Sequence, residues 1–191
     1  TEVGAQLIFD EIQTGIGRTG KMFAFEHYNV VPDILTLGKA LGGGMNVGAF
    51  VSSKEKMLLL SHNPMLGHIT TFGGHPIVCA AVAACLQVIR EENILEEVES
   101  KGAYLEQKLI SHSEVIEIRR KGLMFAIEMI DFKRVEKVVK SCLEKGLIGF
   151  WFLSTPNSFR LSPPLTITFE ELDEAGKIIL EAISATATSN K

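Results

Sequence analysis

Short apolar runs that end at polar or glycine-rich segments mark the first part of the chain. Residues 7–9 lead directly into Asp10, and residues 34–37 lead into Lys39 through a single glycine. Runs of this kind are typical of strands buried on both faces of a parallel sheet. A third run, residues 47–51, is long enough for another strand. The pattern therefore predicts strands at all three places.

A long helical pattern comes after two glycine-rich segments. The first of these, residues 14–20, breaks the apolar pattern and predicts a loop. After the second, residues 73–74, Pro76 suits a first helical turn. The segment 77–109 then consists mostly of strong helix formers, with apolar residues three and four positions apart. We expect a helix over this segment, with a break or kink at Gly102.

Shorter elements follow from residue 115 onward. An amphipathic helix is expected near residues 132–144, followed by a lysine and a glycine that signal its end. Strands are expected at residues 115–118, 123–130, 147–153 and 159–161, and a closing helix at residues 170–185. This order predicts an α/β piece followed by an α+β piece. We place the boundary inside the long helix, which gives domains at residues 1–96 and 97–191.

Composition and charge exclude several kinds of partner. The chain has 191 residues, 46% of them hydrophobic, and a net charge of −4 spread over mixed acidic and basic residues. It can bury a sizeable core, and it has no basic stripe to neutralise nucleic-acid phosphates. No apolar run reaches the roughly 18–20 residues that span a bilayer, and no signal peptide opens the chain. We expect a cytoplasmic protein without nucleic-acid or membrane partners.

The chain start and the cysteines give two further expectations. The chain begins at Thr1 without a methionine and is in a strand pattern by Leu7, so we expect sequence upstream of it. Cys79, Cys85 and Cys142 lack Cys-x-x-Cys spacing, and the first two lie in an apolar helical pattern. All three are expected to be reduced core residues. The five histidines show no pair at metal-ligand spacing with a supporting carboxylate, so no metal site is expected.

Asp10 and Lys39 are the candidate chemical groups, because each follows a predicted strand. Ligands of open α/β sheets bind beyond the carboxyl ends of the strands. A carboxylate can keep a heteroaromatic nitrogen protonated, and a partly desolvated lysine can attack an aldehyde. Chemistry based on pyridoxal 5'-phosphate (PLP) needs both groups. The residues alone leave open an aspartate that shapes a turn and a solvated lysine, and the glycines 42–44 fit either a phosphate contact or a plain loop.

Longer motifs resemble those of one family. The string LIFDEIQTGIGRTGKMFAFEHYNVVPDILTLGKALGGGMNVGAF resembles the cofactor segment of the class III (ω-amino acid) aminotransferases, which include acetylornithine, ornithine and 4-aminobutyrate aminotransferases. The similarity continues through HITTFGGHP and FRLSPPLTIT, and ALGGGMNVGA is nearest to the acetylornithine type. The resemblance implies a fold type I PLP-dependent transferase. The chain would be its C-terminal half, with part of the sheet of the large PLP-binding domain and the small C-terminal domain.

The resemblance implies cofactor roles for residues at the two strand ends. Asp10 would pair with the pyridine nitrogen of PLP and keep the ring an electron sink. Gln13 would contact the phenolic oxygen of the ring. Lys39 would form the Schiff base with the cofactor and, once displaced by substrate, carry a proton between the substrate carbon and the cofactor carbon. Glu11, beside Asp10, is a candidate hydrogen-bond acceptor that stiffens the site.

Two further motifs resemble those for the phosphate and the substrate. Thr71 resembles the threonine that these enzymes lend across a dimer interface to the phosphate of the partner's cofactor. Its neighbour Thr70 is one alternative, and a threonine that only caps the helix after Gly74 is another. Arg160 corresponds to the arginine that binds the substrate α-carboxylate in this family, where the planar guanidinium offers a bidentate fork.

The resemblance implies a transaminase that works as a homodimer. An amino group would pass from an ω-amino or ornithine-like donor to a 2-oxo acid in ping-pong half-reactions. Class III aminomutases and decarboxylases share Asp10 and Lys39, but QTGIGRTG and Arg160 favour the aminotransferase branch. The other alternative is a catalytically silent fragment or dimerisation half, because nothing in this sequence resembles the family's phosphate-binding turn or ring-stacking aromatic residue. We expect the parent protein to be the enzyme and this chain alone to be inactive.

Overall fold

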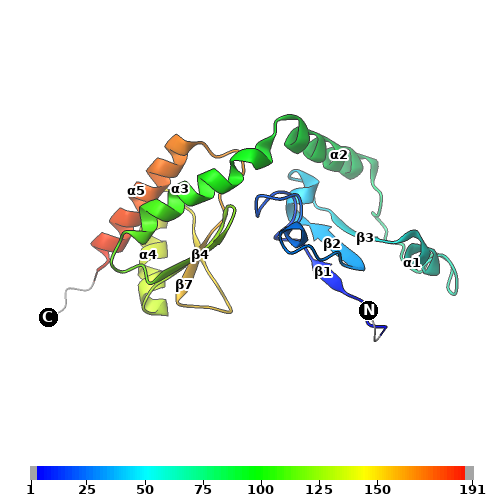
Figure 1. Ribbon diagram of the computed structural model, residues 1–191, viewed down its shortest axis with the longest axis horizontal. Coiled ribbons are helices and arrows are strands. Elements are labelled where there is room, and N and C mark those ends of the chain that lie inside the picture. Colours follow the sequence, from blue (N-terminus) through cyan, green and yellow to red (C-terminus); the bar gives the residue numbers. More distant parts are fainter. Residues whose placement is uncertain (1–3, 188–191) are drawn as a thin grey trace. The chain divides into compact units, whose positions relative to one another are not determined.

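The computed structural model describes residues 4–187, which form two compact units (Figure 1). One unit extends to Leu95 and the other begins at Glu96. The boundary predicted after residue 96 lies one residue from this division. The assignment of the units to a large and a small domain stays a prediction, and the units are described separately.

The first unit contains a sheet in which the described strands follow the order β1-β2-β3. Strand β1 (Ile8–Asp10) pairs in parallel with β2 (Ile34–Gly38), and β3 (Gly48–Ser52) pairs antiparallel with β2. Asp10 lies opposite Thr36, and Lys39 directly follows the last residue of β2. The three predicted strands are confirmed. The parallel pairing brings the carboxyl ends of β1 and β2 to the same edge of the sheet.

The predicted burial of the first strand on both faces is wrong. Ile8 in β1 is 57% exposed and Leu7 before it is also exposed, whereas Leu35 and Leu37 in β2 are buried. The reason is position, because β1 is an edge strand among the described residues and pairs only with β2. The core of this unit is correspondingly small, and its buried hydrophobic members are Ile16, Leu35, Leu37, Leu41 and Ile89.

The predicted long helix consists of separate helices, and the predicted break at Gly102 is wrong. Helix α2 (Pro76–Glu91) begins at Pro76 as expected, and Asn93, in a left-handed conformation with φ +52°, ends this segment. A 3₁₀ turn, η3 (Ile94–Glu97), then leads into α3 (Val98–Ile110), which is continuous through Gly102. A short helix, α1 (Lys54–Leu59), lies in a segment for which no helix was predicted. Asparagine tolerates the left-handed conformation better than most residues, so it can end the helix without a glycine.

In the described part of the second unit, three helices pack on an antiparallel sheet of strand order β4-β5-β7-β6. Helix α4 has the predicted bounds, and Lys145 at its C-cap precedes Gly146 at φ +88°. The strands are β4 (Glu117–Lys121), β5 (Met124–Glu128), β6 (Phe150–Trp151) and β7 (Ser158–Leu161), and the helices are α3, α4 (Phe132–Glu144) and α5 (Phe169–Ala185). The predicted elements are present, but β6 is much shorter than the apolar run that suggested it.

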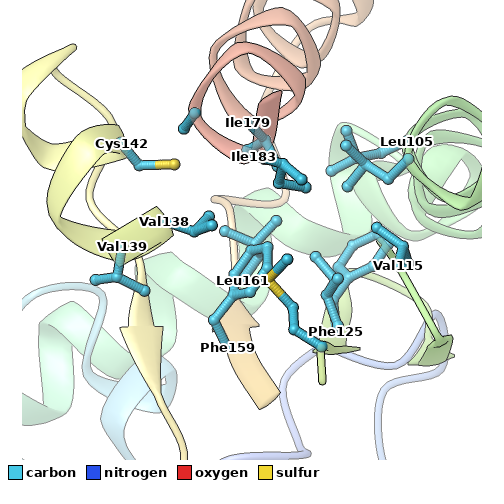
Figure 2. Packing of buried hydrophobic residues seen from close by; sticks show 14 of the residues in the cluster. Leu105, Val115, Phe125, Val138, Val139, Cys142, Phe159, Leu161, Ile179 and Ile183 are labelled. Carbon is cyan, nitrogen blue, oxygen red and sulfur yellow. The ribbon is translucent and has the colours of Figure 1, made fainter. Parts of the chain in front are cut away.

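One face of this sheet forms the main hydrophobic core. Phe125 and Phe159 from the two central strands lie among Leu105 of α3, Val138 of α4 and Ile179 of α5 (Figure 2). Because successive side chains of a strand point to opposite faces, the residues between these core positions lie on the other face. These are Ala126 and Glu128 of β5 and Ser158 and Arg160 of β7.

The prediction that every cysteine is a core residue holds only for Cys142. This thiol is 2% exposed in α4, and its burial raises its pKa to about 11. Cys79 is exposed and Cys85 is half-buried, although all three are free. Ile77 and Val88 on one face of α2 are exposed, whereas Val82, Leu86 and Ile89 on the other face belong to the core of the first unit, so the apolar pattern reports burial for only one face of that helix. Within residues 4–187, no helix is both long and apolar enough to cross a membrane.

Candidate active site

Lys39 lies in a strained turn at the carboxyl end of β2. It is the first residue of the 3₁₀ helix η2 (Lys39–Gly42), and its φ of +46° is in the left-handed region. A non-glycine residue in such a conformation costs roughly 1–3 kcal/mol and persists only where its surroundings impose it. Here the carbonyl of Ala40 accepts the N–H of Gly43 at 3.1 Å and the thiol of Cys85 at 3.3 Å. The turn is thus anchored to α2 immediately beside the lysine.

The side chains of Lys39 and Asp10 remain open to a ligand. Both residues are exposed, and no hydrogen bond or ion pair engages the Lys39 amine within residues 4–187. The Oδ1 of Asp10 accepts the N–H of Ile12 at 3.0 Å, while no partner within that range engages Oδ2. Since Asp10 lies opposite Thr36, three residues before Lys39, the sheet brings the predicted carboxylate and amine to neighbouring strand ends.

Glu11 is the buried carboxylate that holds the adjoining loop. It is 3% exposed, and its Oε1 accepts the N–H of Phe25 at 2.9 Å. Its Oε2 accepts the N–H of Ala24 at 3.0 Å and the hydroxyl of Thr14 at 2.5 Å. Its own N–H donates to the carbonyl of Thr36 at 3.0 Å. One residue therefore joins the loop, the start of η1 (Ala24–His27) and strand β2 next to Asp10.

The loop that Glu11 holds is itself strained. Ile16 has a φ of +56° although it is β-branched, and it is buried. A β-branched residue in the left-handed region is a genuine outlier. At Gly15, a Cβ atom would lie 2.8 Å from the Glu11 carbonyl, so this approach requires glycine. Gln13 lies between Glu11 and this loop in the sequence and is half-buried. Its side chain has no hydrogen bond within the described segment.

Replacing Glu11 with glutamine is expected to lower the free energy of unfolding by about 1–3 kcal/mol, the cost of an unsatisfied buried polar group. Both carboxylate oxygens accept N–H groups, and a glutamine offers one oxygen and one NH₂, so a donor must face a donor. Urea unfolding measures the change. Glu26→Gln is the matched control, because exposed Glu26 accepts, among the described residues, only the N–H of Phe23, which glutamine can also accept. Equal unfolding midpoints for the two variants would contradict the role of Glu11.

Thr70 and Thr71 are exposed residues of the loop before α2. The N-cap of α2 is His75, which makes no side-chain cap hydrogen bond, so the helix-capping alternative is wrong for both threonines. Thr70 lines a cavity of about 700 Å³ together with apolar residues of β3 and α2, and Thr71 does not line it. Neither hydroxyl makes a hydrogen bond within residues 4–187. Both remain candidates for the phosphate contact.

Arg160 belongs to the second unit and lies on the sheet face opposite the core. Its guanidinium carbon is 5.9 Å from the centre of the Phe152 ring, a cation–π contact that uses none of its N–H donors. Three other arginines of this unit, Arg119, Arg120 and Arg134, each bind at least one carboxylate. Arg160 has no carboxylate partner among the described residues, so its five donors are left for an anion.

The candidate residues therefore divide between the two units. The first unit brings Asp10, Gln13 and Lys39 to one edge of its sheet, and Arg160 is presented separately by the second. No group of three or more His, Cys, Asp or Glu residues within positions 4–187 is arranged to hold a metal ion. The candidate site residues are thus a carboxylate, an amide and an amine in the first unit and a guanidinium in the second.

Comparison with known proteins identifies relatives over nearly the whole chain. Acetylornithine aminotransferase of Caldanaerobacter subterraneus subsp. tengcongensis is 44% identical over 181 residues, which cover 93% of this chain and 44% of that protein. An S-selective transaminase from Arthrobacter sp., solved with alanine bound, superimposes with a TM-score of 0.87 at 29% identity, over 99% of this chain and 46% of that one.

Ornithine aminotransferase from Toxoplasma gondii, whose structure has partial occupancy of PLP at the active site, gives a TM-score of 0.85 at 33% identity. The match covers 96% of this chain and 44% of that one. The chain thus spans about half the length of these relatives. The predicted fold class, the C-terminal part of a fold type I PLP-dependent transferase, is confirmed. Since residues 1–183 match the family described as Aminotransferase class-III, this chain belongs to the class III aminotransferases.

Proposed function

We propose that the protein containing this chain is a PLP-dependent aminotransferase. It transfers an amino group from an ω-amino or ornithine-like donor to a 2-oxo acid in two ping-pong half-reactions. The observation that carries the proposal is the pair of open side chains, Asp10 and Lys39, at the adjacent carboxyl ends of two parallel strands. The strained backbone of Lys39 supports it, because such strain clusters at functional sites.

The chemistry of these side chains fits PLP. Asp10 has one carboxylate oxygen engaged and one open, as a partner for a protonated ring nitrogen requires. Among residues 4–187, the Lys39 amine has no partner that would have to be displaced before it binds an aldehyde carbon. The amide of Gln13 can donate to a phenolic oxygen from the loop beside Asp10. When bound, PLP supplies an aldehyde and an electron-withdrawing pyridinium ring.

Each residue then has a defined task. Asp10 holds a proton on the ring nitrogen through charge and hydrogen bonding. The Nζ atom of Lys39 would bind the aldehyde carbon of PLP and, once displaced by the donor amine, would carry a proton from the donor carbon to that cofactor carbon. We assign the phosphate of the partner subunit's cofactor to Thr71, with Thr70 as the alternative, in a homodimer. The exposed apolar residues around these threonines, including Phe72 at 80%, are consistent with a covered surface.

The activity is assigned to the full-length protein and not to this chain alone. The chain corresponds to 44–46% of the length of the three relatives named above. Transamination depends on holding the ring and the substrate in register, and small misplacements cost about 100-fold in rate. A chain with only part of the groups that hold them is therefore expected to be inactive.

Arg160→Gln, made in the full-length protein, is expected to raise KM for a donor that carries an α-carboxylate by about 10- to 100-fold. A charge-assisted hydrogen bond contributes about 1.5–3 kcal/mol, which corresponds to this range. Arg160→Lys keeps the charge but loses the bidentate fork, so we expect an intermediate KM. Steady-state transamination with a panel of donors measures both.

An amine donor without a carboxylate provides the control, since its KM should not change in either variant. The same panel identifies the preferred donor. If Arg160→Gln leaves KM unchanged for every carboxylate-bearing donor, Arg160 does not bind the substrate. Absence of transamination by the full-length protein with PLP and all donors would contradict the proposed function.

A further inference from the structure

The polar face of the second sheet brings several charged side chains into register with Arg160. Across the strands, Arg119 of β4 lies opposite Ala126 of β5, which in turn lies opposite Arg160 of β7. Glu128 of β5 lies opposite Ser158, two residues before Arg160 on the same strand. All five residues lie on the face that the helices do not cover. Glu128 is therefore the diagonal neighbour of Arg160.

A diagonal pair of this kind is close enough to interact. Such neighbours in an antiparallel sheet are about 7–8 Å apart, within reach of long side chains. Only the methyl group of Ala126 lies directly opposite Arg160 on β5, so no bulky side chain separates the two. A carboxylate at Glu128 would be a natural partner for the Arg160 guanidinium.

The structure nevertheless shows Glu128 bound elsewhere through both oxygens. Its Oε2 accepts a hydrogen bond from Nη1 of Arg119, and its Oε1 accepts one from Nδ2 of Asn157 at 3.0 Å. Arg119 is fixed in turn by Glu117, at 2.5 Å, and by the buried hydroxyl of Ser158, at 3.1 Å. The Glu128 carboxylate is thus directed toward Arg119 and not toward Arg160.

We propose that Arg119 is a positioning residue that keeps Glu128 away from Arg160 and thereby keeps Arg160 open to the substrate carboxylate. The inference rests on the proposed function, in which Arg160 binds that carboxylate. Without Arg119, the Glu128 carboxylate loses its cationic partner and turns to the remaining nearby guanidinium. It then competes with the substrate for Arg160, and the affinity for carboxylate-bearing substrates falls.

The test is Arg119→Gln in the full-length protein with PLP. An exposed ion pair is weak, so competition from Glu128 is expected to raise KM for a carboxylate-bearing donor by about two- to fivefold, with kcat little changed. The double variant Arg119→Gln/Glu128→Gln removes the competitor and should restore KM to the wild-type value. Asn157→Ala frees the other oxygen of Glu128 and should shift KM in the same direction by less.

Lys121→Gln is the matched control. Lys121 lies two residues after Arg119 on the same strand, is exposed and is opposite Met124, so its loss changes the charge of this face without touching Glu128. Its KM should equal that of the wild type. A donor amine without a carboxylate should show no change in any of these variants, which separates the effect from general damage to the fold.

Two results would overturn the proposal. Arg119→Gln and Asn157→Ala with unchanged KM would show that Glu128 does not compete. A double variant as impaired as Arg119→Gln alone would show that Arg119 acts in another way. The proposed function fails by a different result, the absence of transamination with every donor, and the role of Arg160 fails by an unchanged KM in Arg160→Gln, so these failures are distinguishable from that of the proposal.

Discussion

Lys39→Ala is expected to abolish transamination by the full-length protein and to remove the site at which PLP becomes covalently attached. General acid–base catalysis by a positioned side chain contributes about 10²- to 10⁴-fold, so a loss of at least this size is expected. After incubation with PLP and reduction with borohydride, peptide mapping should find the label on Lys39 in the wild type. The corresponding peptide of the variant should carry no label. The label provides a readout that does not depend on turnover.

The left-handed backbone at Lys39 adds a second measurement to the same position. Alanine and lysine both have a Cβ atom and both are strained at φ +46°, so Lys39→Ala should leave stability nearly unchanged. Lys39→Gly removes the strain, which raises the free energy of unfolding by about 1–2 kcal/mol relative to Lys39→Ala. The entropy cost of glycine offsets part of this gain, and the remainder should appear as a higher unfolding midpoint in denaturant. Lys21→Ala, at an exposed loop lysine, is the control for non-specific labelling. Labelling spread over surface lysines, or retained turnover in Lys39→Ala, would refute the assignment.

Gly102→Ala is expected to destabilise the second unit by about 1–3 kcal/mol or more, as overpacking does. A Cβ at this position would lie 2.2 Å from the carbonyl oxygen of Gly122 and 2.6 Å from Nη1 of Arg120. A backbone carbonyl, unlike a flexible side chain, cannot rotate away from the contact, so α3 must move away from the turn between β4 and β5. Helix propensity favours alanine by about 1 kcal/mol, so propensity and packing predict opposite signs. Urea unfolding midpoints decide between them.

Gly176→Ala in α5 is the comparison for this prediction. A Cβ there would lie 2.5 Å from Cδ of Lys108, within a flexible side chain that can shift. The loss of unfolding free energy should therefore be smaller than for Gly102→Ala, although Lys108 also binds Asp173. If Gly102→Ala unfolds at the same denaturant concentration as the wild type or higher, the contact with Gly122 does not constrain the helix.

Gly102 also shows why part of the fold could not be predicted from the sequence. A glycine in a helical pattern suggests a break, but this one serves a close approach to a strand turn 20 residues away, which no local pattern reports. The true break is at Asn93, whose tolerance of the left-handed conformation is a recognisable but weak signal. The bounds of α4 were predictable, in contrast, because the end of its apolar stripe and the signal Lys145-Gly146 both place the end of the helix at the same point.

The candidate site was predictable to a similar degree. The strand ends that carry Asp10 and Lys39 follow from short apolar runs, and the resemblance to a family implies their roles. The donors to Glu11 could not be predicted, since Ala24 and Phe25 lie 13 and 14 residues away and reach it only when the loop folds back. For Arg160, only the register with Ala126 shows which side chains share its face.

The hydrogen bonds of Glu11 hold the connection between β1 and β2 in its folded conformation. Parallel strands are usually joined by an α-helix, but between β1 and β2 the chain forms only the four-residue 3₁₀ helix η1. Such a connection has little cooperative hydrogen bonding of its own and belongs to the least stable local units of a protein. Glu11 closes this connection beside Asp10, so under the proposed function opening of the crossover would also disturb the residue that aligns the cofactor. The connection between β1 and β2 of a relative could therefore replace the one in this chain only if an acidic residue at position 11 accepts its hydrogen bonds.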